Sequence, residues 1–445
     1  MSEDYFSFVN QLFNSSKIWE KPEVLKGIRV LELTHAIFGP QVGRVLAQFG
    51  AEVIKVEEPW DGDLFRTATV WSRYWKHSNI MFHVMHANKY FVAINLKKEK
   101  GRELIKKLAK ISDVVVENFR AGLAEAWGIG YTQLSKVNPK IIYLSCSGYG
   151  QWGPLRFFPS VDLVAQSMAG VATLTGFPGQ TYKLPDYYGD FLPGMFGVIS
   201  VLTALYYREK TGKGQYIDLS QAECLMRVMH NFTYLSITEK EIGCTGNIDP
   251  AMSPSGIFRT KDGKFIALAI ATDEQFYKLL EAMNKSSLII NNEKFSKIHE
   301  RLKPENMEEL SKIVEEWVKT KSMEEIIELA KKYGFPASPV MDDWEIFNDE
   351  WRRERGSIVT VNDEMYGEAV LPGPVVMLHK TPGRIKWLSR PVGYHNKYVF
   401  KKLLGLSDEE IKQLEKEGVI GYWDNKPGLK PPIYYDLKND KIFNY

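Results

Sequence analysis

Asp190 is the residue of this 445-residue chain whose surroundings best suit covalent chemistry. It stands directly before an apolar run, residues 191–207, that predicts a buried helix. An aspartate at that place can cap the helix by accepting hydrogen bonds from its first free N–H groups. The same N–H groups would also stabilise a carboxylate that must stay ionised and attack as a nucleophile. From the residues alone, Asp190 is therefore either a helix cap or a catalytic nucleophile.

Residues 148–153 read Gly-Tyr-Gly-Gln-Trp-Gly and have the glycine spacing of a dinucleotide-binding loop. Pro154 follows at once, however, and no helix opens at the third glycine. No acidic residue ends a following strand at the distance that a ribose contact needs. We therefore do not expect a nicotinamide cofactor.

Metal-binding, hydrolase and NTPase motifs are also missing from the sequence. Of its eight histidines, only His83 and His86 lie three residues apart, and no carboxylate completes a metal site with them. The sequence contains neither the G-x-S-x-G turn of a serine hydrolase nor a Walker loop. We expect no metal and no tightly bound cofactor.

Short apolar runs alternate with amphipathic stretches in the first half of the chain, which predicts a parallel α/β sheet. Strands are expected at residues 28–33, 52–56, 91–96, 113–116 and 141–145, with helices at 41–49 and 100–111. The expected fold is a right-handed, doubly wound, Rossmann-like large domain. A smaller α+β domain follows, with a hairpin at residues 256–270 and then amphipathic helices.

Charge and composition exclude several classes of partner. The chain carries 57 basic and 55 acidic residues, so it has no net field to hold a nucleic acid or an anionic membrane. The start shows no signal peptide, and the apolar run 191–207 is shorter than the roughly 20 residues that span a bilayer. Cys146, Cys224 and Cys244 lack C-x-x-C spacing and are expected to stay reduced. We expect a cytoplasmic protein that binds neither nucleic acid nor membrane.

Ordered motifs along the chain then point to a family. They are Gly27-Ile-Arg-Val-Leu-Glu-Leu-Thr with Gly39-Pro40, Gly50-Ala-Glu-Val-Ile-Lys-Val-Glu57 with Gly62-Asp63, Asn88-Lys89, Glu117-Asn118-Phe119, Gly189-Asp190 with Gly194, Arg208-Glu-Lys-Thr-Gly-Lys-Gly-Gln215 and Leu403-Leu-Gly-Leu-Ser-Asp-Glu-Glu410. From about residue 27 to 420 the chain resembles the class III CoA-transferases, which include formyl-CoA transferase, carnitine CoA-transferase and the bile-acid-inducible F-like proteins.

The resemblance implies a covalent mechanism and a set of CoA contacts. Asp190 matches the aspartate of the family's Gly-Asp-x-x-x-Gly motif, which forms a mixed anhydride and then an aspartyl-CoA thioester. CoA is implied as a co-substrate, exchanged between an acyl-CoA and a small carboxylic acid, and the protein is implied to be an interlocked homodimer. The CoA contacts carried over are His35, Ala36, Ile37, Phe38, Asn88, Lys89, Ile94, Lys97, Asn118, Phe119 and Leu123.

Two basic positions of formyl-CoA transferase do not carry over. They are occupied here by Glu58 and Ala126, so the CoA phosphates are expected to find other cations. The candidates are Arg44, Lys89 and Lys97. The glycine-rich loop that shields the formyl-CoA transferase site has no counterpart in residues 247–256, which weighs against formyl or oxalyl specificity.

Two alternatives share the fold. Acyl-CoA racemases pair the aspartate with a histidine at the position of Val161, and racemisation needs a base on each face of the α-carbon. Val161 therefore argues against a racemase. The other alternative is a catalytically inactive CoA-binding homologue. The sequence does not say which acids are exchanged.

The resemblance and the sequence pattern together divide the chain. We place an N-terminal extension at residues 1–26, the first part of the large domain, with CoA-binding and catalytic residues, at 27–225, a linker at 226–248, the small domain at 249–335, a return segment to the large domain at 336–420 and a C-terminal extension at 421–445.

Overall fold

The computed structural model describes residues 3–68, 75, 78–229, 231–241, 243–289 and 292–423, so most of the predicted C-terminal extension lies outside the described residues. The chain forms two compact units. Unit 1 comprises residues 1–169, 184–229 and 350–445, and unit 2 comprises residues 170–183 and 230–349. Each unit is described below by itself.

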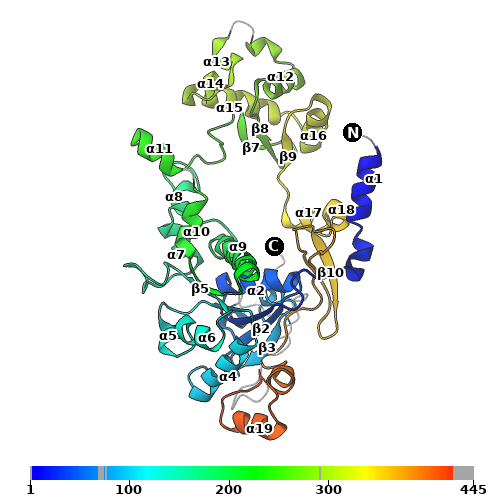
Figure 1. The fold of residues 1–445 in the computed structure, drawn as a ribbon. Helices are drawn as coiled ribbons and strands as arrows, with labels where there is room; N and C mark the ends of the chain where they lie inside the picture. Colours follow the sequence, from blue (N-terminus) through cyan, green and yellow to red (C-terminus); the bar gives the residue numbers. More distant parts are fainter. Residues whose placement is uncertain are drawn as a thin grey trace. The chain divides into compact units, whose positions relative to one another are not determined.

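Unit 1 is built on a six-stranded, all-parallel sheet in the order β3-β2-β1-β4-β5-β6 (Figure 1). Its strands are β1 (Arg29–Leu33), β2 (Glu52–Glu57), β3 (Tyr90–Ala93), β4 (Val114–Glu117), β5 (Ile142–Ser147) and β6 (Gln215–Ser220). The five strands expected from the sequence are confirmed. The sixth, β6, follows a long helix, and its polar residues lack the apolar run that marks the others.

Helices cover both faces of this sheet, because alternate strand residues point to opposite faces. Leu31, Ile54 and Val115 pack with α4 (Glu99–Lys110), whose apolar stripe includes Leu104 and Leu108. The neighbouring residues in each strand pack on the other face with α2 (Phe38–Gln48) and α9 (Tyr188–Thr211). This is the doubly wound arrangement predicted from the sequence, and both faces of the central strands are buried.

The remaining elements of unit 1 flank the sheet. The helices are α1 (Glu3–Leu12), α3 (Ile80–Met85), α5 (Leu123–Ala126), α6 (Tyr131–Val137), α7 (Asp162–Met168), α10 (Gln221–Arg227), α18 (Glu350–Glu354) and α19 (Asp408–Lys416). An antiparallel hairpin, β10 (Ile358–Asp363) with β11 (Gly367–Pro372), belongs to the return segment.

Helix α9 packs closely on α2 because glycines line their contact. A Cβ atom on Gly194 would lie 2.6 Å from the side chain of Gln41, and one on Gly197 would lie 2.6 Å from Val42. Among the described residues, α9 is the one helix long and apolar enough to cross a membrane, a test that the core helices of soluble proteins also pass. On the opposite face of α9, Ile199 is 58% exposed and Tyr206 is 64% exposed. Only one side of the predicted core helix is therefore buried in a single chain.

Unit 2 has its own small sheet and apolar core. The predicted hairpin is present as β7 (Ser255–Arg259) and β8 (Phe265–Ala269), and β9 (Ala337–Pro339) extends it. Its helices are α8 (Val171–Leu174), α11 (Asn231–Thr238), α12 (Asp273–Ala282), α13 (Glu293–Ser296), α14 (Ile298–Arg301), α15 (Pro304–Val318), α16 (Met323–Tyr333) and α17 (Asp343–Phe347). The unit is wider than residues 249–335, since Gly246 hydrogen-bonds Gly176 and thereby joins a distant segment to it.

Candidate active site

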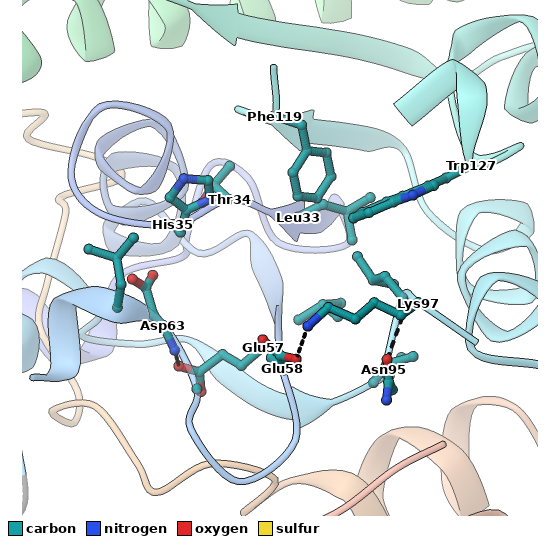
Figure 2. Close-up of a pocket in the computed structure, with 15 residues that line it drawn as sticks. Leu33, Thr34, His35, Glu57, Glu58, Asp63, Asn95, Lys97, Phe119 and Trp127 are labelled. Atoms are coloured by element: carbon teal, nitrogen blue, oxygen red, sulfur yellow. Dashed lines mark hydrogen bonds and ion pairs between the residues drawn. The ribbon is translucent and has the colours of Figure 1, made fainter. Parts of the chain in front are cut away.

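The carboxyl ends of β1, β2, β3 and β4 surround a pocket of about 270 Å³ (Figure 2). In this strand order the winding changes direction between β1 and β4, and such a switch point is where open parallel sheets bind ligands. Residues that follow the four strands line it: Leu33, Thr34, His35, Val56, Glu57, Glu58, Gly62, Asp63, Leu64, Ile94, Asn95, Leu96, Lys97, Phe119 and Trp127. Four of the predicted CoA contacts, His35, Ile94, Lys97 and Phe119, therefore meet in one pocket.

Flat side chains form one side of this pocket. The rings of Phe119 and Trp127 lie 5.4 Å apart in an edge-to-face arrangement, and the His35 ring lies 6.5 Å from Phe119. Figure 2 shows the two aromatic rings on the same side of the pocket. Burial lowers the pKa of His35, which favours its neutral imidazole. The wall suits a planar, largely apolar group such as a purine.

Lys97 and Glu58 form an ion pair at the pocket rim. Their Nζ and Oε1 atoms are 2.7 Å apart, and 71% and 48% of the two side chains are exposed. Glu58 follows β2 directly, whereas Lys97, the cation at the rim, comes from the segment after β3. Because the pair is exposed, a phosphate can displace the carboxylate at small cost.

Two acids that line the pocket, Glu57 and Asp63, pair with buried cations. Arg66 donates to both carboxylate oxygens of Glu57, at 2.8 and 2.9 Å. Lys55 pairs with Asp63 at 2.8 Å. Burial opposes ionisation of Asp63, but Lys55 and the backbone N–H of Ala36 outweigh it and hold the pKa of that carboxyl below its usual value. Each of the two acids thus has a buried cationic partner.

The turn after β1 is held by side chains from neighbouring loops. The Asn118 amide receives the His35 N–H at 2.9 Å and donates to the His35 carbonyl at 2.8 Å. Asp63 accepts the N–H of Ala36, whose φ is +63°. The turn then opens α2 at Phe38, and its N-cap residue Ile37 supplies no side-chain capping bond. The side chain of Ile37 therefore occupies none of the first N–H groups of α2, which belong to Phe38 and Gly39 because Pro40 has no N–H.

Two predicted CoA contacts lie in the protein core instead of the pocket. Asn88 bridges the carbonyls of Ala47 and Arg384 and accepts the N–H of Lys386, which fastens the return segment to the sheet. Lys89 is fully buried and pairs with Glu32 at 2.8 Å. Burial lowers the pKa of Lys89 to about 8.

The structure gives these two residues structural partners, and their contact with CoA stays a prediction. The same holds for Leu123, which begins α5 and does not line the pocket. Of the predicted phosphate cations, Lys97 reaches the pocket. Arg44 lies on α2, with Nη1 3.5 Å from Gln41 and 3.7 Å from the sulfur of Met85.

Asp190 lies in the first turn of α9, not before it. The helix begins at Tyr188, and its N-cap is Tyr187, which has a φ of +59° and makes no side-chain capping bond. The cap interpretation of Asp190 is therefore wrong. The capping role falls to Asp162, whose carboxylate accepts the Gly189 N–H at 2.7 Å and is itself held by Gln166 at 3.0 Å.

The Asp190 carboxyl is held by one strong hydrogen bond and is otherwise disfavoured as an anion. Gln221 donates from Nε2 to Oδ1 at 2.6 Å. Burial raises the pKa of Asp190 to about 7, the neighbouring charge of Asp162 adds to the effect, and the Gln221 hydrogen bond opposes it. A carboxylate with a raised pKa is a stronger base and nucleophile than an exposed one, as covalent catalysis requires.

Sequence reasoning missed Gln221 and the supporting role of Asp162. The contact between Gln221 and Asp190 joins residues 31 positions apart, so no local pattern could signal it. The glycine-rich segment 148–153 ends β5 and opens no helix. Among the described residues, no group of three or more His, Cys, Asp or Glu side chains could hold a metal ion.

Comparisons with protein families, sequences and solved structures identify relatives of this chain. The model of CoA-transferase family III matches residues 25–396. The chain is 35% identical to the succinyl-CoA–L-malate CoA-transferase alpha subunit of Chloroflexus aurantiacus, over 89% of this chain and 92% of that protein. It is 30% identical to the succinyl-CoA:glutarate CoA-transferase of Homo sapiens, over 89% and 90%. The crystal structure of a CaiB/BaiF family protein from Brucella suis superposes with a TM-score of 0.75 at 29% identity, covering 86% of this chain and 100% of that one. The chain therefore belongs to CoA-transferase family III.

Proposed function

We propose that this CoA-transferase exchanges CoA between a succinyl-CoA-like thioester and a second carboxylic acid through covalent intermediates on Asp190. The observation that carries the proposal is the Asp190 carboxyl itself. It is largely buried, burial raises its pKa to about 7, and in the described part of the chain only Oδ1 accepts a hydrogen bond. The second oxygen, Oδ2, remains available for attack on a thioester carbonyl.

The reaction begins with two nucleophilic attacks on carbonyl carbons. Oδ2 of Asp190 attacks the acyl-CoA carbonyl, the C–S bond breaks, and CoA leaves as a thiolate with the bonding pair. The product is a mixed anhydride between Asp190 and the acyl group. The thiolate then attacks Cγ of Asp190, the first acid leaves as a carboxylate with Oδ2, and an aspartyl-CoA thioester remains.

The second acid reverses these steps. Its carboxylate attacks Cγ of the aspartyl thioester, thiolate leaves, and the thiolate then attacks the new acyl carbonyl to release Asp190 and the product acyl-CoA. No proton needs to be supplied, because the acids react as anions and thiolate is a good leaving group. Water must stay out while the anhydride exists, since its hydrolysis would dissipate the thioester.

The start of α2 supports the first attack. Glycines allow α9 and α2 to touch one turn beyond Asp190, where a Cβ on Gly194 would lie 3.1 Å from the Phe38 carbonyl. The nucleophile is thereby brought to the N-terminal end of α2, whose first N–H groups have no acceptor within the helix. Such donors stabilise the oxyanion that forms on an attacked thioester carbonyl.

The positive charge of Arg44, close to the contact between α2 and α9, favours a dicarboxylic acid as a substrate. Several relatives are named for succinyl-CoA with malate, citramalate or glutarate. Arg44 lies one helical turn beyond Gln41, is partly buried, and forms no ion pair with any carboxylate in the described part of the chain. We assign Arg44 to the distal carboxylate of the acid. Arg44→Met should lower kcat/KM for succinate by about 10- to 100-fold, as expected for a charge-assisted bond of roughly 1.5–3 kcal/mol, and leave butyrate little changed.

A homodimer is part of the proposal. The outer face of α9 exposes Ile199, Leu202 and Tyr206, and Val161 and Met168 of the neighbouring α7 segment are exposed as well. An apolar area of this kind, bordering a nucleophile that must be kept from water, is what a second copy would cover. Sedimentation at low concentration should show a folded dimer, and a stable folded monomer with full activity would contradict it.

Trapping the intermediate tests the function directly. The enzyme is incubated with succinyl-CoA, treated with hydroxylamine and digested, and the peptides are examined by mass spectrometry. We expect the hydroxamate of Asp190 alone, and none in Asp190→Asn. Hydroxamate on another carboxylate, or transfer activity retained by Asp190→Asn, would overturn the assignment.

A further inference from the structure

The hydrogen bonds that Gln221 donates point to a role beyond holding a neighbouring side chain in position. It is the first residue of α10 and is only 3% exposed. Its Nε2 donates to Oδ1 of Asp190 at 2.6 Å and to the carbonyl of Gly189 at 2.9 Å. An amide nitrogen has two hydrogens, so both are directed at the nucleophile and its own backbone.

Three features fix which end of the amide faces Asp190. Ser160 donates its hydroxyl to Oε1 of Gln221 at 3.0 Å, so the oxygen end is already occupied. Pro193 has no N–H, and the Gly189 carbonyl, four residues earlier, is therefore free of the helix ladder and accepts from Gln221 instead. If the amide rotated by half a turn, it would lose the bonds to Asp190 and to the Gly189 carbonyl, because both of these oxygens only accept.

The glycine-rich segment at residues 148–153 holds Ser160 and the start of α10 in place. A Cβ on Gly148 would overlap the Cβ of Ser160, so only glycine lets Ser160 approach. The Gly148 carbonyl accepts the N–H of Ala222 at 3.1 Å, which fixes the first turn of α10. Ser220 caps that helix through the N–H of Glu223. The segment that resembles a dinucleotide loop thus serves to place Gln221.

We infer that Gln221 is the oxyanion donor for the half of the reaction that takes place on Asp190 itself. The inference rests on the proposed function. When thiolate attacks Cγ of the aspartyl anhydride, a C–S bond forms and the carbonyl electron pair moves onto Oδ1. Nε2–H of Gln221 already points at that atom and stabilises the new charge. Collapse restores the carbonyl and expels the first acid as a carboxylate, and the second acid's attack on the thioester uses the same donor.

The acyl carbonyl of the substrate is a different atom with different donors, so Gln221 should matter unequally to the two attacks. Loss of one oxyanion donor lowers kcat by roughly 10²- to 10³-fold. A residue that merely holds Asp190 in place would slow both attacks together. One that merely lowers the pKa of Asp190 would be dispensable at high pH. These three roles are separable.

The experiment follows both attacks in Gln221→Met, which keeps the side-chain length and lacks the donor. Enzyme and succinyl-CoA are mixed without a second acid, quenched, and assayed for free CoA thiol and, by intact mass, for CoA bound to the protein. Wild type should accumulate bound CoA. In Gln221→Met we expect free thiol to appear while bound CoA forms about 100-fold more slowly. Gln166→Met is the matched control, because its amide donates to Asp162 and not to Asp190, and it should keep the wild-type ratio of bound to free CoA.

The pH profile completes the test. We expect the defect of Gln221→Met to persist on the alkaline plateau, above the Asp190 titration. Parallel loss of thiol release and bound CoA, or recovery of wild-type turnover at high pH, would overturn the inference. If wild type never binds CoA covalently, the proposed function fails instead, and the two failures are distinguishable.

Discussion

Replacing Asp190 by Asn should stabilise the protein at alkaline pH while abolishing transfer. The Asp190 carboxyl has a pKa of about 7 in the folded chain, against 3.8 for an ordinary aspartate, because it is buried and lies near Asp162. Between these values the folded state binds a proton that the unfolded state has lost, so stability falls as pH rises from about 4 to about 7. At 1.36 kcal/mol per pKa unit, the full effect above pH 7 is roughly 4 kcal/mol as an upper bound.

Asparagine fits the same contacts without the charge. Its carbonyl oxygen can still accept from Gln221, and its amide can donate toward the carboxylate of Asp162. We therefore expect Asp190→Asn to unfold several degrees higher than wild type at about pH 8, and at nearly the same temperature around pH 4, where Asp190 of the folded chain carries no charge to relieve. Differential scanning calorimetry at the two pH values measures this.

A matched control variant distinguishes the loss of a buried charge from the general effect of removing a carboxylate. Asp186 is exposed in the loop before α9, so Asp186→Asn removes a carboxylate without relieving a buried charge. It should shift the unfolding temperature equally at both pH values. Destabilisation of Asp190→Asn at pH 8, or the same shift at pH 4 and pH 8, would refute the reasoning that burial and Asp162 disfavour the ionised nucleophile.

Further predictions concern the rim, the glycine segment and the reaction type. Glu58→Gln frees Lys97 and should tighten CoA binding by about two- to fivefold in calorimetric titration, the range expected for an exposed pair; weaker binding would show that Lys97 does not meet a phosphate. Gly148→Ala should displace Ser160 and lower turnover with little change in CoA affinity, and unaltered turnover would separate that segment from the nucleophile. Since Val161 offers no second base, the enzyme should move CoA without washing solvent deuterium into the α-position of a 2-methylacyl-CoA; deuterium entry at the rate of turnover, without CoA transfer, would favour a racemase.

Much of the fold could be read from the sequence, because it depends on short-range patterns. The apolar runs at 28–33 and 52–56 predict buried parallel strands, and the lysine-faced stretch at 100–111 predicts the helix that connects β3 to β4. Parallel strands with short connections place their carboxyl ends at one edge, so the meeting of His35, Lys97 and Phe119 follows from topology.

Residue roles that depend on distant partners could not be read in this way. The pairing of the buried Lys89 with Glu32 could not be read from the sequence, because a lysine's surroundings depend on which strand lies beside it, and its contact with CoA stays a prediction. Asp190 looks like a helix cap until Asp162, which lies on α7, is seen to cap α9 through the N–H of Gly189, 27 residues later in the chain.

The sequence by itself determined the family, the doubly wound sheet and the identity of the expected nucleophile, since each follows from residue types and their order. Only the tertiary structure decided how that nucleophile is held. Gln221 reaches Asp190 because Pro193 frees a carbonyl, Gly148 admits Ser160, and β6 delivers α10 to the start of α9. Hydrogen bonds of about 3 Å between separate elements are set by packing, and no linear spacing encodes them.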